Sequence, residues 1–555
     1  MVELRPPEQV MTLSRLGSLH QCRLSFMRQL TRRMAVEGWV FAQSRFDMDA
    51  RGVGVAVYTA QGPERAYSLV AFAHDLPAEM RSDRVIAKAW DATFTLFDGI
   101  PEQADIDRLA KNVPLQEAGR VSAREISVSR ANRSVRLWAH VVEALSEGRQ
   151  PEPAQLDAVG YLMRTTAVYG SGKLGAADRE MIADRPEMQA PFQAEMLSVY
   201  LTRWFVRDLV EHMARARGGD VAVGLDPALA RRLGIGNSTG LGMAPYIINH
   251  PILFNNWIRA RETAIARVRS VAHATPEALA QFRKLLERSK VSVEMWRSDH
   301  PVQIEKVASL KRDLAALEAH LEAEGLAEPS PWDTLMHWAA GALSEEGQEL
   351  LASLILEPYP ELVDALGSTM SDDAPEAFHI DGSMTVGAVR ALMRARFGWA
   401  FGIDWAAPEN CARAWYVSEE KLEPRLGERF EEPIDAYEQP LAPARDAAAA
   451  EDVLSTWDQA APVARFLARH PEHRHTVRRA QMSLNAPYGE LQSNTIAADV
   501  MPIDMLRAKL SFFGVTRFDP RSDRWVRVNM YSGAPYPEEL SCENADLWVY
   551  PEETA

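Results

Sequence analysis

Four segments near the N-terminus decide the fold that the sequence predicts: WVFAQSRF (39–46), GVGVAVYTA (52–60), AYSLVAFAH (66–74) and RVIAKAWDATFTLF (84–97). They are rich in Val, Phe, Tyr, Trp and Thr, and their apolar residues recur with the period of two that is typical of strands. The turns between them are too short for crossover helices, so neighbouring strands should run antiparallel. We therefore expect a small antiparallel β-meander in this part of the chain.

Beyond residue 129 the apolar residues recur mostly at helical spacing. The clearest elements are two apolar seams within residues 276–324, which are joined by the turn Asp299-His300-Pro301. This pattern predicts an antiparallel helical hairpin. We favour a hairpin that packs in the core, and the alternative is an arm through which copies of the chain form a homo-oligomer. The seam residues are Leu279, Phe282, Leu286, Val293 and Trp296 in the first helix and Val307, Leu310, Leu314, Leu317 and Leu321 in the second.

Together these patterns predict an α+β fold that is predominantly α-helical. A small N-terminal domain with the antiparallel meander would cover residues 1–125. A helical domain with glycine-rich loops and the hairpin would cover 126–330, and the proline-rich stretch 327–333 would end it. Residues 331–555 would form a mostly helical C-terminal domain with a small terminal β-hairpin.

The composition is that of a globular protein: 555 residues, 47% of them hydrophobic and 25% charged, with a formal net charge of −16. A chain this acidic is not built to coat nucleic acid or anionic lipid. No apolar run reaches the roughly 18 residues of a membrane-spanning helix. The three cysteines are too few and too scattered for a disulfide framework. We expect a soluble, multi-domain, cytoplasmic protein without a nucleic-acid or membrane partner.

Lysine is scarce in this chain. Only nine of the 61 basic residues are lysine, and the other 52 are arginine. Arginine codons are GC-rich, so the excess indicates a GC-rich bacterial genome, with a functional demand for arginine as the alternative. A lysine in an unusual setting is therefore easy to notice.

The established catalytic motifs are missing from the sequence. It contains neither the His-Glu-x-x-His zinc motif nor the Gly-x-Ser-x-Gly nucleophile elbow. No motif requires a metal or a redox cofactor, so we predict no cofactor. Three segments combine glycine with uncharged hydrogen-bonding side chains, and such loops are where binding residues concentrate.

The first segment is RTTAVYGSGKLG (164–175). Its three clustered glycines free the backbone to approach a ligand, and Lys173 places a mobile cation beside them. Ala167 and Leu174 stand where a Walker A loop requires Gly and Ser or Thr, so an ATPase is not indicated. We predict that Lys173 and Tyr169 contact an anionic ligand, and the alternative is a plain connector between helices.

The second segment is GIGNSTGLGMAPY (234–246). Bare glycine amides beside Asn, Ser and Thr side chains could form a nest for an anion. The helix that we expect to begin at Pro251 would add the positive end of its dipole. His250, just before it, is our candidate for acid–base catalysis, and the alternative is a capping histidine. The predicted binding residues are Asn237, Ser238, Thr239, Gly240 and Gly242.

The third segment is SLNAPYGELQSNT (483–495). It holds amide and hydroxyl side chains together with one tyrosine and one carboxylate. We predict that Asn485 and Asn494 orient a ligand and that Tyr488 moves a proton. The alternative is a long loop that satisfies its own backbone.

These residues lead to one functional expectation. The chain would be a cytoplasmic enzyme or small-molecule-binding protein that acts on an anionic organic ligand, bearing a carboxylate or phosphate, by metal-independent, non-redox acid–base chemistry. The three loops would converge on a cleft between domains. The alternative is a non-enzymatic helical scaffold or protein-interaction module that uses the 276–324 hairpin.

Overall fold

The computed structural model describes most of the chain. The described residues are 2–80, 89–115, 120–166, 182, 184–188, 190–240, 251–296, 301–326, 329–370, 379–407, 442–490, 507–515, 517–520, 525–546 and 548. Contacts divide the chain into two compact units, which are described separately below. The first unit contains residues 1–18, 240–282 and 308–508, and the second contains 19–239, 283–307 and 509–555. The three-part division at residues 125 and 330 stays a prediction.

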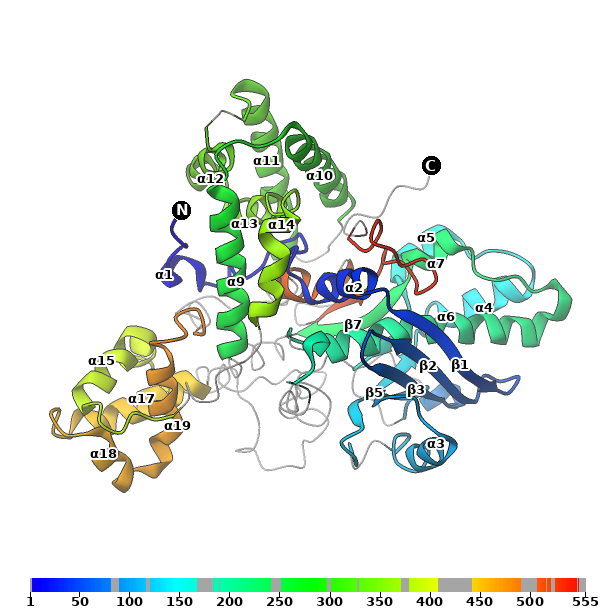
Figure 1. Cartoon of the computed structure of the whole chain (residues 1–555), viewed down its shortest axis with the longest axis horizontal. Coiled ribbons are helices and arrows are strands. Elements are labelled where there is room, and N and C mark those ends of the chain that lie inside the picture. The colour runs from blue at the N-terminus through cyan, green and yellow to red at the C-terminus, as the bar shows by residue number, and fades with distance from the viewer. Residues whose placement is uncertain are drawn as a thin grey trace. The chain divides into compact units, whose positions relative to one another are not determined.

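One nine-stranded sheet organises the second unit (Figure 1). Its strand order is β1-β2-β3-β4-β5-β6-β7-β9-β8. The pairs from β1 to β6 and the pair β8–β9 are antiparallel, whereas β6 and β7 are parallel. The strands are β1 (Val40–Met48), β2 (Gly54–Gln61), β3 (Ala66–Ala73), β4 (Ala92–Asp98), β5 (Glu125–Arg133), β6 (Tyr161–Thr165), β7 (Gly234–Gly240), β8 (Arg517–Pro520) and β9 (Trp525–Met530).

The predicted fold class is therefore wrong in one central respect. The antiparallel meander exists, but it is the first part of a sheet that recruits strands from along the whole chain, not a small separate N-terminal domain followed by a helical region. The terminal hairpin also forms, and it joins the same sheet as β9 and β8. The prediction failed because β6 and β7 are short and their residues do not alternate between apolar and polar. Such strands are formed by their neighbours and not by their own periodicity.

Glycine explains how β7 fits into the sheet. A Cβ on Gly234 would lie 2.4 Å from the Met530 carbonyl oxygen in β9, and a Cβ on Gly236 would lie 2.7 Å from the Tyr161 ring in β6. Only glycine allows these close approaches. The predicted glycine-rich loop is thus a strand in its first half, and these two glycines serve sheet packing.

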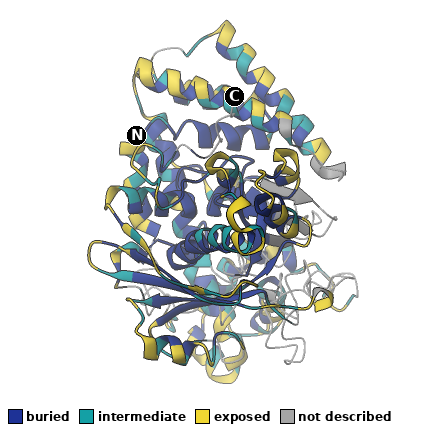
Figure 2. Cartoon of the chain, turned by 90° about the vertical axis from the view of Figure 1, so that its right-hand side faces the viewer, coloured by how far each residue is buried: buried dark blue, intermediate teal, exposed yellow. Residues whose placement is uncertain are grey.

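Helices cover both faces of this sheet. Tyr58 of β2 and Phe94 of β4 point to one face, where both rings contact Phe205 of α6 (Gln193–Gly218). Val57 and Val128 belong to the cluster on the other face, which also contains residues of α3 (Gln103–Leu109). Strands β2 to β6 are accordingly mostly buried (Figure 2). The other helices of this unit are α2 (Phe26–Val36), α4 (Trp138–Ser146), α5 (Pro153–Val159), α7 (Pro227–Arg232), the short η1 (Ala78–Met80), η4 (Pro186–Met188) and η5 (Gly219–Val221), and the π-helix η11 (Lys509–Phe513).

Helix α7 leads directly into β7 and carries a side-chain cap. The Asp226 carboxylate accepts hydrogen bonds from the backbone N–H groups of Ala228 (2.9 Å) and Leu229 (3.2 Å), and Pro227 occupies the first turn. We expect Asp226→Ala to lower the free energy of unfolding by about 1 kcal/mol. Urea titration measures this loss. Asp226→Asn is the control and should retain most of the stability, so equal losses in the two variants would contradict the capping role.

The first unit is helical. Helix α9 begins at Pro251, as predicted, and ends at Arg269. Its long buried face includes Trp257, which is 1% exposed. The other helices of this unit are α1 (Pro7–Val10), α12 (Pro331–Ala342), α13 (Glu345–Leu354), α14 (Pro360–Val363), η6 (Asp364–Met370), α15 (Val386–Phe397), η8 (Gly398–Ala400), α17 (Ala442–Ser455), α18 (Val463–Arg469), η10 (Pro471–His473) and α19 (Arg474–Met482).

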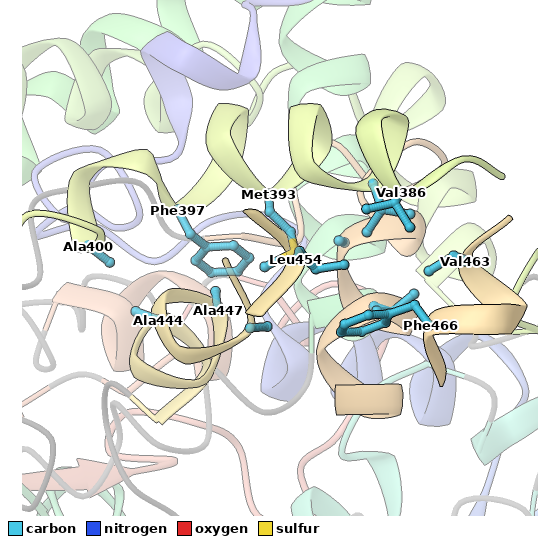
Figure 3. Close-up of a cluster of buried hydrophobic side chains, with 13 residues drawn as sticks. Val386, Met393, Phe397, Ala400, Ala444, Ala447, Leu454, Val463 and Phe466 are labelled. Carbon is cyan, nitrogen blue, oxygen red and sulfur yellow. The ribbon is translucent and has the colours of Figure 1, made fainter. Parts of the chain in front are cut away.

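A separate hydrophobic cluster joins α15, α17, α18 and α19 (Figure 3). Met393 and Phe397 of α15 lie over Ala447 and Leu454 of α17, and Phe466 of α18 completes the buried group. The alanines of α17 make this close packing feasible because they place little volume between the helices. The cluster is the core of residues 386–480.

The two helices predicted between residues 276 and 324 both form, as α10 (Pro276–Met295) and α11 (Pro301–Ala323). The seam is buried at Phe282 (0% exposed) and Leu286 (3%) in α10 and at Leu310 (0%) and Leu317 (1%) in α11. An oligomerisation arm would need these side chains to be exposed. The seam therefore contributes to the core of the chain. Across the described residues, no helix is both long and apolar enough to span a membrane.

Candidate functional site

The structure describes only part of the predicted site. Tyr169, Lys173, Gly242, His250 and Asn494 lie outside the described residues. Ser238, Thr239 and Gly240 form the end of β7, where only the backbone is described. Asn237, Asn485 and Tyr488 are described in full. Their roles as binding or catalytic residues stay predictions.

Two of the three predicted loops begin side by side. Strands β6 and β7 are parallel neighbours, with Arg164 opposite Gly236. Their carboxyl ends therefore meet at one edge of the sheet, which is where parallel strands commonly present ligand-binding residues. The first loop continues β6 and the second continues β7, so the structure brings the starts of both to this edge.

Asn237 links these two strands through its side chain. Its amide nitrogen donates a hydrogen bond of 2.9 Å to the Thr165 carbonyl oxygen at the end of β6. A carbonyl oxygen only accepts, so this bond fixes which end of the amide faces β6. The Asn237 Oδ1 atom therefore faces away from the Thr165 carbonyl. The Asn237 side chain is buried, with the residue 1% exposed.

The partner of that oxygen is a lysine that the sequence prediction did not select. The Lys509 Nζ atom donates a hydrogen bond to Asn237 Oδ1. Lys509 begins the π-helix η11 and is 4% exposed. A single turn of π-helix is rare and occurs frequently at functional sites. The sheet edge thus carries a buried amine that is held by the end of β7.

Burial changes the chemistry of this amine. Removal of the charged form from water lowers the pKa of Lys509 from 10.5 to about 7. At neutral pH a substantial fraction of Lys509 is then the neutral amine, which can accept a proton or attack a carbonyl carbon. A lysine of ordinary pKa is almost wholly protonated under the same conditions.

The π-helix is supported by a rigid aromatic group. The Phe513 ring lies 5.4 Å from the Phe26 ring and 4.8 Å from the Phe192 ring. Phe192 has a φ of 60°, an uncommon backbone conformation for a bulky residue. Such strain persists only where the surroundings impose it, and it clusters at functional sites. The contacts of Phe513 therefore hold the C-terminal end of η11, the helix in which Lys509 is the first residue.

Several buried polar groups beside this helix and at the end of β6 have no hydrogen-bond partner among the described residues. These are the hydroxyls of Thr166, Ser25 and Ser511 and both polar atoms of the Gln21 amide. Ser25 and Gln21 face Gly514, whose N–H donates to the Lys509 carbonyl. Buried polar groups in native proteins are usually paired, so these groups are exceptions that lie near the Lys509 backbone and at the end of β6.

The third predicted loop belongs to the first unit. There the Tyr488 hydroxyl donates a hydrogen bond of 2.7 Å to the Arg5 carbonyl oxygen, and its N–H donates to Asn255 Oδ1 at 3.0 Å. Burial, with Glu262 as a further cause, raises the pKa of Tyr488. Asn485 is exposed. In this arrangement the Tyr488 hydroxyl anchors the N-terminal segment of the chain.

The residues predicted from the sequence include Lys173 and not Lys509, although the sequence carries a signal for Lys509. Lys509 is one of only nine lysines, and it stands in the apolar run Ala-Lys-Leu-Ser-Phe-Phe (508–513). A charged residue within such a run is expected to be buried with its polar end paired. That Asn237 is its partner could not be read from the sequence, because 272 positions separate the two residues.

Other kinds of site are not evident in the described part of the chain. It contains no group of three His, Cys, Asp or Glu side chains that could hold a metal ion. A cavity lined by Arg203 and Tyr536 has a volume of about 10 Å³, which is room for a water molecule and not for an organic ligand. The comparisons give no further guide, because no protein-family model, curated protein or solved structure matches this chain.

Proposed function

We propose that the protein binds an anionic organic ligand and carries out non-redox proton-transfer chemistry on it, with the Lys509 amine as the base. The observation that supports this proposal is the hydrogen bond from Lys509 Nζ to Asn237 Oδ1 at the shared end of β6 and β7. It deepens the expectation drawn from the glycine-rich loops, because both loops start at this edge.

Asn237 and the burial of the amine have separate roles in this proposal. Asn237 accepts one N–H of Lys509 and so fixes the position of the amine nitrogen beside β7. Burial brings the pKa of the amine to about 7, so the amine can take up a proton and release it again at neutral pH. The ammonium formed by that transfer would attract an anionic ligand at short range.

A small carbonyl reagent tests whether the amine is accessible and neutral. Limiting formaldehyde with cyanoborohydride at neutral pH should methylate Lys509 before the other eight lysines, because only roughly 1 in 2,500 molecules of a lysine with ordinary pKa is neutral there. Peptide mass spectrometry after short reaction times gives the order of labelling. The exposed Lys111 serves as the internal reference.

Two variants sharpen this test. Asn237→Asp places a carboxylate against the amine, favours the ammonium and should abolish the early labelling of Lys509. Asn485→Asp makes the same change at an exposed position and should leave the labelling order as it is. Labelling of Lys509 after Lys111, or not at all, would overturn the proposal, since an amine that a one-carbon carbonyl cannot reach is no base for a larger ligand.

A further inference from the structure

Residues 463–482 of the first unit form two short helices that are joined by a tight turn. Helix α18 ends at Arg469 and α19 begins at Arg474, with η10 between them. The rings of His470 and His473, at the two ends of the turn, have centroids 6.2 Å apart. Two helices joined by a turn of three or four residues are the arrangement of the helix-turn-helix motif.

Both helices pack on the same hydrophobic core, the cluster that α15 and α17 complete (Figure 3). Their fully buried members of this cluster are Val463 and Phe466 in α18 and Val477 and Ala480 in α19. Because the inner faces share one core, the outer faces of α18 and α19 lie outside it and adjoin across the turn. In DNA-binding proteins with this motif, the second helix lies in the major groove and its N-terminal residues contact the bases.

The outer faces of both helices carry exposed arginines. Arg465 and Arg469 are four positions apart in α18, so they project from the same side of the helix. Arg474 is the first residue of α19, and its Nε donates a hydrogen bond of 3.3 Å to His475 Nε2. Within the described part of the chain, none of these three guanidinium groups has a carboxylate partner. We call them the α18–α19 surface.

The remaining charged side chains of the motif have partners within the chain. Arg479 Nη2 lies 3.1 Å from Glu490 Oε2, and Arg478 also has contacts within the chain. Glu472 is the one acidic residue of the motif, and its Oε1 lies 3.1 Å from His470 Nδ1. These groups therefore take no part in the α18–α19 surface.

We propose that the α18–α19 surface binds double-stranded DNA. Arg465 and Arg469 contact backbone phosphates, and the N-terminal end of α19 enters the major groove, where Arg474 reaches a base edge. The major groove of duplex RNA does not admit side chains in this way, which favours DNA. The net charge of −16 opposes binding through the rest of the chain, so the contact is confined to this motif. The motif includes neither Lys509 nor Asn237, so this binding does not depend on the function proposed above.

Fluorescence anisotropy with a labelled mixed-sequence DNA duplex of roughly 30 base pairs, about three helical turns, tests the proposal on the full chain. We expect the wild type to bind, and its affinity to fall at least roughly tenfold between about 50 and 200 mM salt, because two phosphate contacts release counterions. Arg465→Gln and Arg469→Gln should each weaken binding and lower the slope of log affinity against log salt by about 0.9, since each removes one phosphate contact. Both side chains are exposed, so these variants should keep the wild-type circular dichroism spectrum.

Arg445→Gln is the matched control. Arg445 lies in α17, which packs on the same core, and it pairs with Asp446 at 3.4 Å while 37% of its side chain is exposed. This variant should keep the wild-type affinity and salt slope. A glutamate polymer and the single strand of the same sequence should both bind far more weakly than the duplex. The proposal is overturned if the wild type does not bind the duplex, if Arg445→Gln loses as much affinity as the α18 variants, or if the polymer or the single strand binds as tightly as the duplex.

Discussion

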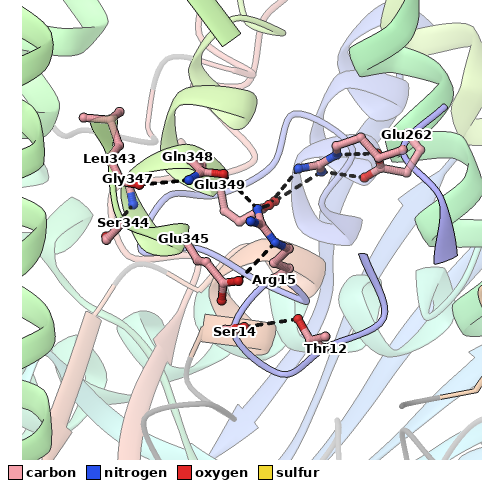
Figure 4. Close-up of polar contacts among 12 residues, drawn as sticks. Thr12, Ser14, Arg15, Glu262, Leu343, Ser344, Glu345, Gly347, Gln348 and Glu349 are labelled. Carbon is pink, nitrogen blue, oxygen red and sulfur yellow. Dashed lines mark hydrogen bonds and ion pairs between the residues drawn. The ribbon is translucent and has the colours of Figure 1, made fainter. Parts of the chain in front are cut away.

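Glu349→Gln should lower the free energy of unfolding by about 3–5 kcal/mol, because it removes the carboxylate that several buried arginines share. Glu349 Oε1 lies 3.1 Å from Arg15 Nη1 (Figure 4). It also lies 2.8 Å from Arg5 Nη1, and Glu349 Oε2 accepts from Arg261. The side chains of Glu349 and Arg261 are both 0% exposed. A glutamine keeps the volume but leaves buried positive charge without compensation.

The same network makes the stability depend on pH in acid. Burial alone would raise the pKa of Glu349, but Arg5 and Arg261 outweigh it and hold it at about 2, against 4.5 for the unfolded chain. A carboxylate with a lowered pKa in the folded state stabilises above its unfolded pKa, and this contribution is lost as the pH falls from 4.5 towards 2. The contribution is about 3 kcal/mol, and Glu349→Gln should lack this part of the acid-induced loss.

Urea unfolding monitored by circular dichroism measures both effects. Glu345→Gln is the matched control, because Glu345 lies one turn earlier in α13 and pairs with Arg15 at 3.4 Å while 47% of its side chain is exposed. An exposed pair of this kind contributes less than about 1 kcal/mol. If the two variants lost the same small amount, the buried network would not be a main source of stability in the first unit.

Lys509→Met should increase the free energy of unfolding relative to the wild type near neutral pH. This increase should become smaller as the pH rises into the alkaline range. A lysine whose pKa falls from 10.5 to about 7 on folding must give up its proton, or remain charged without water. Between these two values the unfolded chain binds the proton and the folded chain does not, so wild-type stability rises with pH. The rise attributable to Lys509 between about pH 7 and pH 9.5 is about 3 kcal/mol.

The comparison uses the difference between the two proteins at each pH, since tyrosines also titrate in alkali. Methionine has a similar length and no charge, although Asn237 then loses one hydrogen bond, which offsets part of the gain. Lys290→Met is the control. Lys290 pairs with Glu287 at 3.4 Å near the surface, and its replacement should leave the pH profile parallel to that of the wild type. A Lys509→Met profile that is also parallel would show that folding does not shift the pKa of Lys509.

The fold could be predicted from the sequence only where a local pattern carries it. The strands of residues 40–73 have a clear period of two, and α10 and α11 have clear seams and prolines in their first turns. Strand β7 has neither, because GIGNSTG is defined by its neighbours β6 and β9. A sheet that recruits strands hundreds of residues apart leaves no signal in any short window of sequence.

The candidate site likewise contains one residue that the local sequence predicts and one that it does not. The sequence predicts Asn237 as a binding residue because it is a polar side chain beside glycines, and the structure gives it two buried hydrogen bonds. Lys509 stands in an apolar run, so the pattern of glycines and polar side chains that marks the other candidates does not include it.

The most direct test of the central claim is a titration of Lys509 itself. Reductive methylation with ¹³C-formaldehyde gives one carbon resonance for each labelled lysine, and the Lys509→Met variant assigns the resonance of interest. We expect a midpoint at about 7 in the wild type and a markedly higher midpoint in Asn237→Asp. A Lys509 resonance that titrates at about 10.4, like an ordinary lysine, would contradict the account.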